Sequence, residues 1–85
     1  MEYLLTFQNT HYAIHSEKIL IKNKIPVSVM PLPTSLGDFC GICLRIAAPD
    51  FIDGRKHLSE ANLPVEGIFE IDRVNHERTY TRWKP

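Results

Sequence analysis

Two stretches of this sequence have the spacing of an amphipathic helix, and each has a strand-like stretch before and after it. In the first, residues 11–23, one stripe contains Ala13, Ser16 or Glu17, Leu20, and Asn23 or Lys24. Asn9 or Thr10 is expected to cap this helix by accepting an unpaired backbone N–H group. Pro26 ends it, because proline has no N–H to donate.

The second helix is expected to begin at Pro49 and Asp50 and to be broken by residues 62–67. Its apolar residues share one side: Phe51, Leu58 and Ala61. Gly54 lies inside this helix and weakens it by about 1 kcal/mol relative to alanine.

Four segments are strand-like: 3–7, 27–30, 41–47 and 68–74. In the third of these, Ile42, Leu44 and Ile46 alternate with other residues, which predicts one buried face. The order strand, helix, strand, strand, helix, strand predicts an α+β, ferredoxin-like βαββαβ sandwich. Its four-stranded antiparallel sheet would have the strand order 4-1-3-2, with both helices on one face. We expect residues 1–74 to form this single domain and residues 75–85 a tail or arm, with room for a short extra strand.

The composition narrows the class of protein. Ten basic residues balance ten acidic ones, which argues against broad electrostatic binding to nucleic acid or to a membrane surface. No apolar run is long enough to span a membrane, and two cysteines are too few for a secreted disulfide scaffold, so we expect a cytoplasmic protein. The sequence has no Gly-rich phosphate loop, Ser-His-Asp set or paired carboxylates, and we expect no self-sufficient enzyme and no cofactor.

Both cysteines, Cys40 and Cys43, lie in one Cys-x-x-Cys motif. A disulfide or redox dithiol is one interpretation. If residues 40–43 are extended, their α-carbons are about 10 Å apart and their side chains face opposite sides of the sheet. Because a disulfide needs roughly 4.4–6.8 Å, it forms only if Cys40 and Gly41 still belong to the preceding turn.

A metal site is the second interpretation. Tetrahedral zinc takes four ligands, and Cys40, Cys43, His11 and His15 would supply them. Alternatively, both histidines lie on a solvated face of the first helix.

A reactive thiol is the third interpretation. Cys40 lies at a loop-to-strand junction, which the predicted topology places beside the start of the first helix. There Thr10 and His11 would form a supporting shell, and helix N–H groups favour the thiolate. Such a thiolate can accept and pass on sulfur or selenium. Cys43 is then either a small residue packed beside Arg45 or a second thiol.

The segments "FQNTHYAIHSEKIL" (7–20) and "IPVSVMPLPTSLGDFCGICLRI" (25–46) resemble the small putative selenium/sulfur carrier protein-like family of bacteria. The resemblance covers about residues 3 to 72. It implies that Cys40 is the family cysteine. The matching loop residues are Pro31, Pro33 and Gly41, and the matching residues of the first helix are Ala13, Glu17 and Leu20.

The resemblance implies a thiol-based carrier or adaptor that works with protein partners. It would take sulfur or selenium as a persulfide-type group from a donor, such as a cysteine desulfurase-type enzyme, and pass it to an acceptor. The alternative is a non-catalytic interaction module that forms a homodimer or docks a partner through its sheet.

Two further expectations concern the surface. Arg45 and Glu70 occupy outward-facing positions of two strands and could form an ion pair. Trp83, with Arg78, Arg82 and Lys84, would form either a docking arm or a frayed tail.

Overall fold

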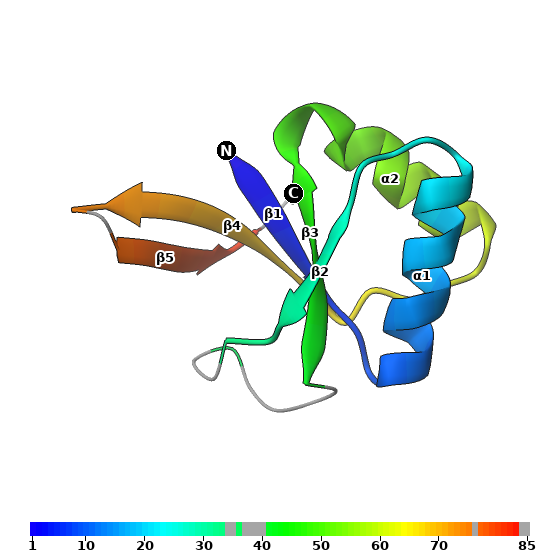
Figure 1. The fold of residues 1–85 in the computed structure, drawn as a ribbon, viewed down its shortest axis with the longest axis horizontal. Coiled ribbons are helices and arrows are strands. Elements are labelled where there is room, and N and C mark those ends of the chain that lie inside the picture. Colours follow the sequence, from blue (N-terminus) through cyan, green and yellow to red (C-terminus); the bar gives the residue numbers. More distant parts are fainter. Residues whose placement is uncertain (34–35, 37–40, 76, 84–85) are drawn as a thin grey trace.

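In a computed structural model, described over residues 1–33, 36, 41–75 and 77–83, the chain forms two α-helices and one antiparallel sheet (Figure 1). The elements in chain order are β1 (Glu2–Thr6), α1 (Thr10–Lys22), β2 (Ser28–Pro31), β3 (Ile42–Ala47), α2 (Ala48–Glu60), β4 (Gly67–Val74) and β5 (Glu77–Arg82). Over these residues the sheet has five strands in the order β2-β3-β1-β4-β5. The predicted α+β class, with two helices and an antiparallel sheet, is confirmed. The prediction of four strands is wrong.

The additional strand, β5, comes from the segment predicted as a tail or arm. Val74 pairs with Glu77, and Asn75 follows the end of β4 in a turn conformation. Asn75 has a φ of 54°, a conformation that asparagine tolerates better than most residues. Six residue pairs then join β4 to β5, so backbone hydrogen bonding holds a strand whose sequence is almost entirely polar.

Both helices have a local sequence reason to begin where they do. The side chain of Asn9 caps α1 by accepting a hydrogen bond from the Tyr12 N–H at 2.9 Å, as predicted for this position. α2 has no side-chain cap, but it has a proline in its first turn, where the missing N–H costs nothing. None of the helices in the described part of the chain is long and apolar enough to cross a membrane.

Gly54 lies where α2 packs closely against side chains of the main core. A Cβ atom at this position would lie 2.7 Å from Ile46 Cδ1 and 3.5 Å from Leu20 Cδ2. Because Gly54 is buried along with Phe51 and Leu58, the glycine lets α2 approach α1 and the sheet closely.

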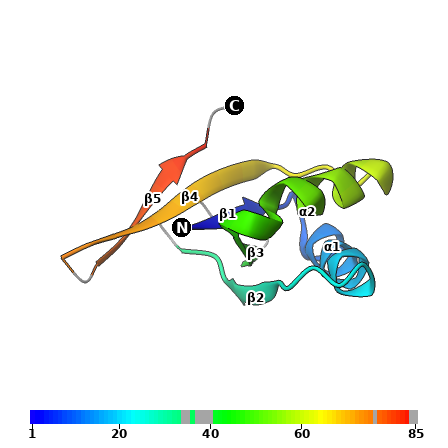
Figure 2. The same ribbon diagram turned by 90° about the horizontal axis from the view of Figure 1, so that it is seen from above.

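The helices cover one face of the sheet, and the main core lies between these layers (Figure 2). Its buried residues come from the strands, the helices and the segments that follow them: Leu5, Phe7, Ala13, Leu20, Ile25, Leu44, Ile46, Phe51, Leu58 and Leu63. In both views the β4–β5 hairpin projects beyond the helix-covered part of the sheet.

The opposite face, which we call the helix-free face, has a second and smaller cluster. Its buried members are Leu4, Leu32, Cys43 and Ile71, and Met30, Leu36, Phe69 and Tyr80 pack against them. Leu32 and Leu36 follow β2 and cover the neighbouring part of β3. The prediction of one buried face for this strand is therefore wrong, because Cys43 and Leu44 are both completely buried.

Trp83, the residue after β5, packs against the main core. Its ring packs edge-on against Phe51 at a centroid distance of 5.1 Å, and the Arg55 guanidinium lies 4.8 Å from the ring centroid of Trp83. The backbone N–H of Trp83 also donates to the Ile68 carbonyl at 2.9 Å. The interpretation of Trp83 as part of a frayed tail is therefore wrong, the interpretation of this segment as a docking arm stays a prediction, and Lys84 lies outside the described residues.

The partner of Arg45 is Glu2 and not Glu70. Arg45 Nε lies 3.1 Å from Glu2 Oε2, with both side chains about one-third exposed. Glu70 is directly opposite Tyr3 in the sheet, and Tyr3 stacks on Phe51 of α2. Since directly opposite residues share a face, Glu70 projects from the helix-covered face and cannot reach Arg45 on the other side.

Candidate functional site

The loop that connects β2 to β3, residues 32–41, contains the position of the predicted thiol and is closed by hydrogen bonds at its base. β2 and β3 pair up to Pro31 and Ile42, and the Leu32 N–H then donates to the Gly41 carbonyl at 3.0 Å. Pro31 occurs at the end of an edge strand, where a residue without an N–H is tolerated. Leu32 is buried in the second cluster, so the first residue of the loop is fixed against the sheet.

Gly41 supplies the backbone conformation that connects this loop to β3. Its φ is +79°, which strains any residue with a side chain. No atom lies within 4 Å of the position that a Cβ would take, so the requirement for glycine is conformational and not steric crowding. Gly41 is one of the predicted loop residues that the structure describes.

Cys40, the predicted carrier thiol, lies outside the described residues. The surrounding elements are described. The end of β1 is paired with the start of β3, since Thr6 is opposite Cys43. The start of α1, with the predicted supporting residues Thr10 and His11 both exposed, lies at the same end of the molecule as the start of β3 (Figure 1).

Cys43, the predicted second thiol or packed small residue, is completely buried on the helix-free face. Its Sγ donates a weak hydrogen bond to the Pro31 carbonyl oxygen at 3.8 Å. Leu4 and Leu32 belong to the same cluster. Because the side chain is completely buried, a partner cannot reach the Cys43 sulfur in this conformation.

The two histidines of the metal alternative lie together on α1. The rings of His11 and His15 are 6.4 Å apart, and both side chains are exposed beside a shallow hollow that Ile14 and Lys18 also line. Within the part of the chain that the structure describes, no group of three or more His, Cys, Asp or Glu side chains could hold a metal ion. Cys43 is buried in the sheet and does not join the histidines.

The β4–β5 hairpin carries a further feature that the sequence indicated only in part, since Arg78 and Arg82 were expected on a docking arm but Arg73 was not. Arg73 lies directly opposite Arg78, and Phe69 lies directly opposite Arg82. Because side chains alternate between faces along a strand, all three arginines share the helix-free face with Phe69 and Tyr80. The hairpin's acidic residues project from the other face: Glu70, Asp72 and Glu77.

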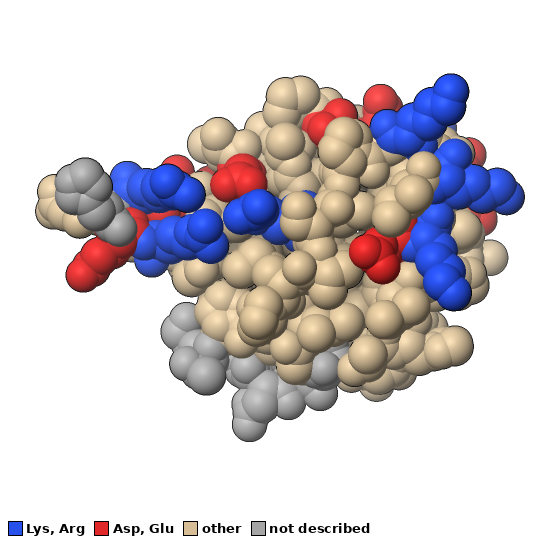
Figure 3. Space-filling model, in the orientation of Figure 1, with Lys and Arg blue, Asp and Glu red and all other residues tan. Residues whose placement is uncertain are grey.

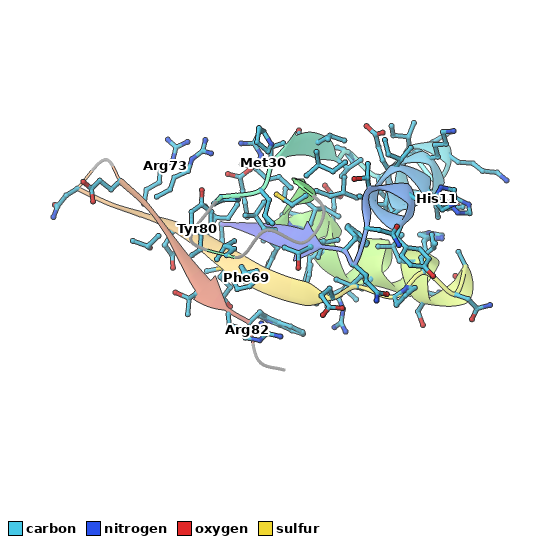
Figure 4. The ribbon with its side chains drawn as sticks, turned by 90° about the horizontal axis from the view of Figure 1, so that it is seen from below. His11, Met30, Phe69, Arg73, Tyr80 and Arg82 are labelled. Carbon is cyan, nitrogen blue, oxygen red and sulfur yellow. The ribbon has the colours of Figure 1, made fainter. Side chains whose placement is uncertain are left out.

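We call Arg73, Arg78, Arg82, Phe69 and Tyr80 the arginine face. In Figure 4, Arg73 lies nearest the tip of the hairpin, followed by Tyr80 and then by Phe69 and Arg82, whereas His11 lies on α1 at the other end of the molecule. Figure 3 shows basic side chains gathered over the projecting hairpin. The alternation Phe-x-Ile-x-Arg and Arg-x-Tyr-x-Arg was the available signal, but it has meaning only once the two segments are known to pair.

Comparison with known proteins gives one match, to a protein family. The chain matches the family model described as "Putative Se/S carrier protein-like" over residues 2–70. This match extends from β1 into β4 and includes the whole loop between β2 and β3. No curated protein and no solved structure matches the chain.

Proposed function

The chain belongs to the Putative Se/S carrier protein-like family, and we propose that it carries sulfur or selenium on the thiol of Cys40 between a donor and an acceptor protein. The observation that carries the proposal is the family match over residues 2–70, which includes the cysteine and the loop around it. In this proposal Gly41 and the prolines of the loop present the thiol, and Thr10 and His11 form the supporting shell.

The described part of the loop supports this proposal. The hydrogen bond between Leu32 and Gly41 and the burial of Leu32 anchor the two ends of a ten-residue segment, 32–41, on the sheet. The positive φ of Gly41 directs the chain into β3 immediately after residue 40. A loop anchored at both ends presents a reactive group at lower entropic cost than a free tail would.

The transfer step needs no external oxidant or reductant. The Cys40 thiolate would attack the outer sulfur of a persulfide on the donor protein. A bond forms between the Cys40 sulfur and that outer sulfur, the donor's S–S bond breaks, and the donor cysteine leaves as a thiolate. Transfer onward to an acceptor thiolate repeats the same exchange in the opposite sense.

The test is to load the protein and locate the added sulfur. Wild type, Cys40→Ser and Cys43→Ser proteins are incubated with a persulfide donor, treated with an alkylating reagent, digested and analysed by mass spectrometry. We expect an added mass of about 32 Da on the peptide that contains Cys40 in wild type and in Cys43→Ser, and none on Cys40→Ser, because the buried Cys43 is inaccessible.

Cys43→Ser is the matched control, since it removes the other thiol by the same substitution. An adduct on Cys43, or none on any variant under conditions where a small-molecule thiol is loaded, contradicts the proposal. If Cys40→Ser retains every partner interaction and every cellular phenotype of the wild type, the protein is an interaction module and the thiol is dispensable.

A further inference from the structure

We infer that the arginine face of the β4–β5 hairpin is a docking site for an extended, acidic segment of a partner protein. The identity of that partner as a sulfur or selenium donor or acceptor rests on the proposed function, whereas the contact chemistry follows from the hairpin alone. The feature that points to an anionic partner is a row of exposed guanidinium groups on one face, with the acidic side chains of the hairpin on the other.

The first argument is the charge of this face. Arg73 and Arg78 lie directly opposite each other, an arrangement of like charges that disfavours the sheet. Among the described residues the two ion pairs are Arg45 with Glu2 and His57 with Glu60, and neither involves an arginine of the face. A carboxylate between Arg73 and Arg78 would relieve their repulsion and accept hydrogen bonds from both guanidinium groups.

The second argument is spacing. Arg82 lies four positions after Arg78 along β5, which corresponds to about 13–14 Å in a strand, and Arg73 lies opposite Arg78 on β4. An extended peptide has the same rise, so two carboxylates four residues apart would match both positions. The residue midway between them would lie over Tyr80, whose half-buried ring offers an apolar contact.

The third argument concerns the class of partner. Arginine, tyrosine and phenylalanine are enriched in protein–protein interfaces, and these are the residue types of the arginine face. Single-stranded nucleic acid would need open aromatic ring faces for its bases. The Arg82 guanidinium already lies over the Phe69 ring at 5.6 Å, which favours an acidic protein segment.

The fourth argument is the position of the face. Phe69 and Tyr80 pack in the same cluster as Leu32 and Leu36 of the 32–41 loop. The part of a partner that lies over Phe69 and Tyr80 would therefore lie beside Leu32 and Leu36, the described residues of this loop in the cluster. In a carrier, a cationic surface near this loop would hold the partner close to the thiol, although the net charge of the chain is zero.

The experiment measures binding of a fluorescein-labelled peptide, Gly-Glu-Ser-Leu-Ser-Glu-Gly, by fluorescence anisotropy. It compares wild type with an Arg73→Glu/Arg78→Glu variant and with a control, Lys18→Glu/Lys56→Glu, which makes the same charge change at two exposed helical positions. We expect the arginine variant to bind about tenfold more weakly and the lysine control to bind like wild type. Binding should also weaken when NaCl is raised from about 0.05 to about 0.5 M.

Equal weakening in both variants would show only a net-charge effect and would overturn the inference, as would the absence of wild-type binding. Tighter binding of an oligouridine of about ten nucleotides, lost in the arginine variant, would assign the face to single-stranded nucleic acid instead. Far-UV circular dichroism and thermal unfolding establish that each variant is folded; if the double variant does not fold, Arg73→Gln replaces it, with Lys18→Gln as its control.

The Cys40→Ser protein separates this inference from the proposed function. If it binds the peptide like wild type but cannot be loaded with sulfur, both hold. If wild type is loaded but does not bind the peptide, only the docking inference fails.

Discussion

The backbone N–H of Leu32 donates to the carbonyl of Gly41 at 3.0 Å and closes the loop that contains Cys40. Gly41 has a φ of +79°, and no atom lies within 4 Å of the position that a Cβ would take. We therefore expect Gly41→Ala to lower the free energy of unfolding by about 1–2 kcal/mol, because the left-handed region is strained for a residue with a Cβ. Urea denaturation followed by circular dichroism measures this change.

Gly41→Asn is the matched control, because asparagine tolerates positive φ better than alanine. It should lose less stability than Gly41→Ala. Equal losses in the two variants would mean that the effect comes from contacts of the side chain and not from the backbone conformation.

Burial of Cys43 predicts a large difference in thiol reactivity between the folded and unfolded protein. In Cys40→Ser protein, Cys43 supplies the remaining thiol, and its side chain is completely buried. We expect iodoacetamide to modify it about a hundredfold or more slowly in buffer than in concentrated urea, because reaction requires opening of the structure. Comparable rates in the two conditions would show that the helix-free face is open around β3.

The contact between Gly54 and Ile46 predicts a coupled pair of substitutions. Gly54→Ala gains about 1 kcal/mol of helix propensity but forces a Cβ to within 2.7 Å of Ile46 Cδ1. Overpacking of this kind costs about 1–3 kcal/mol, so the net result should be a loss of stability. Ile46→Val removes Cδ1 and alone costs about 0.5–1.5 kcal/mol.

In the double variant the crowding is absent, so the loss should be smaller than the sum of the two single losses by about 1 kcal/mol. The free energies of unfolding of all four proteins, measured in urea, give this coupling directly. A Gly54→Ala variant with a higher free energy of unfolding than wild type would mean that the Ile46 side chain moves aside without loss of stability.

The helices and the first four strands were predictable because their signals are local. Asn9, Pro26 and Pro49 mark helix ends through their own side chains, and the periodicity of the apolar residues distinguishes helix from strand within each segment. β5 was not predictable in the same way. Its residues, Glu-Arg-Thr-Tyr-Thr-Arg, include one large apolar side chain, and the strand exists because β4 supplies hydrogen-bonding partners.

In the candidate site, too, the features with local sequence signals were predictable and those that depend on distant segments were not. The Cys-x-x-Cys motif and Gly41 were visible in the sequence, because each is a property of a few adjacent residues. The burial of Cys43 was not, because it depends on Leu32 and Leu36 folding over the sheet. The arginine face was also hidden, since Arg73 and Arg78 become neighbours only through the register of the hairpin.

Trp83 tests whether the end of β5 contributes to the stability of the domain. Its ring contacts Phe51 and the Arg55 guanidinium and lies edge-on to Tyr3 at 6.5 Å, so truncation removes aromatic contacts at the edge of the main core. We expect Trp83→Ala to lower the free energy of unfolding by about 1–3 kcal/mol, less than a fully buried tryptophan would, and Trp83→Phe to lose less. Because the chain has a single tryptophan, its fluorescence in the wild type should change in the same urea transition as the far-UV circular dichroism. A fluorescence transition at lower urea than the circular dichroism, together with a Trp83→Ala variant as stable as wild type, would instead indicate that this end of the chain detaches before the domain unfolds.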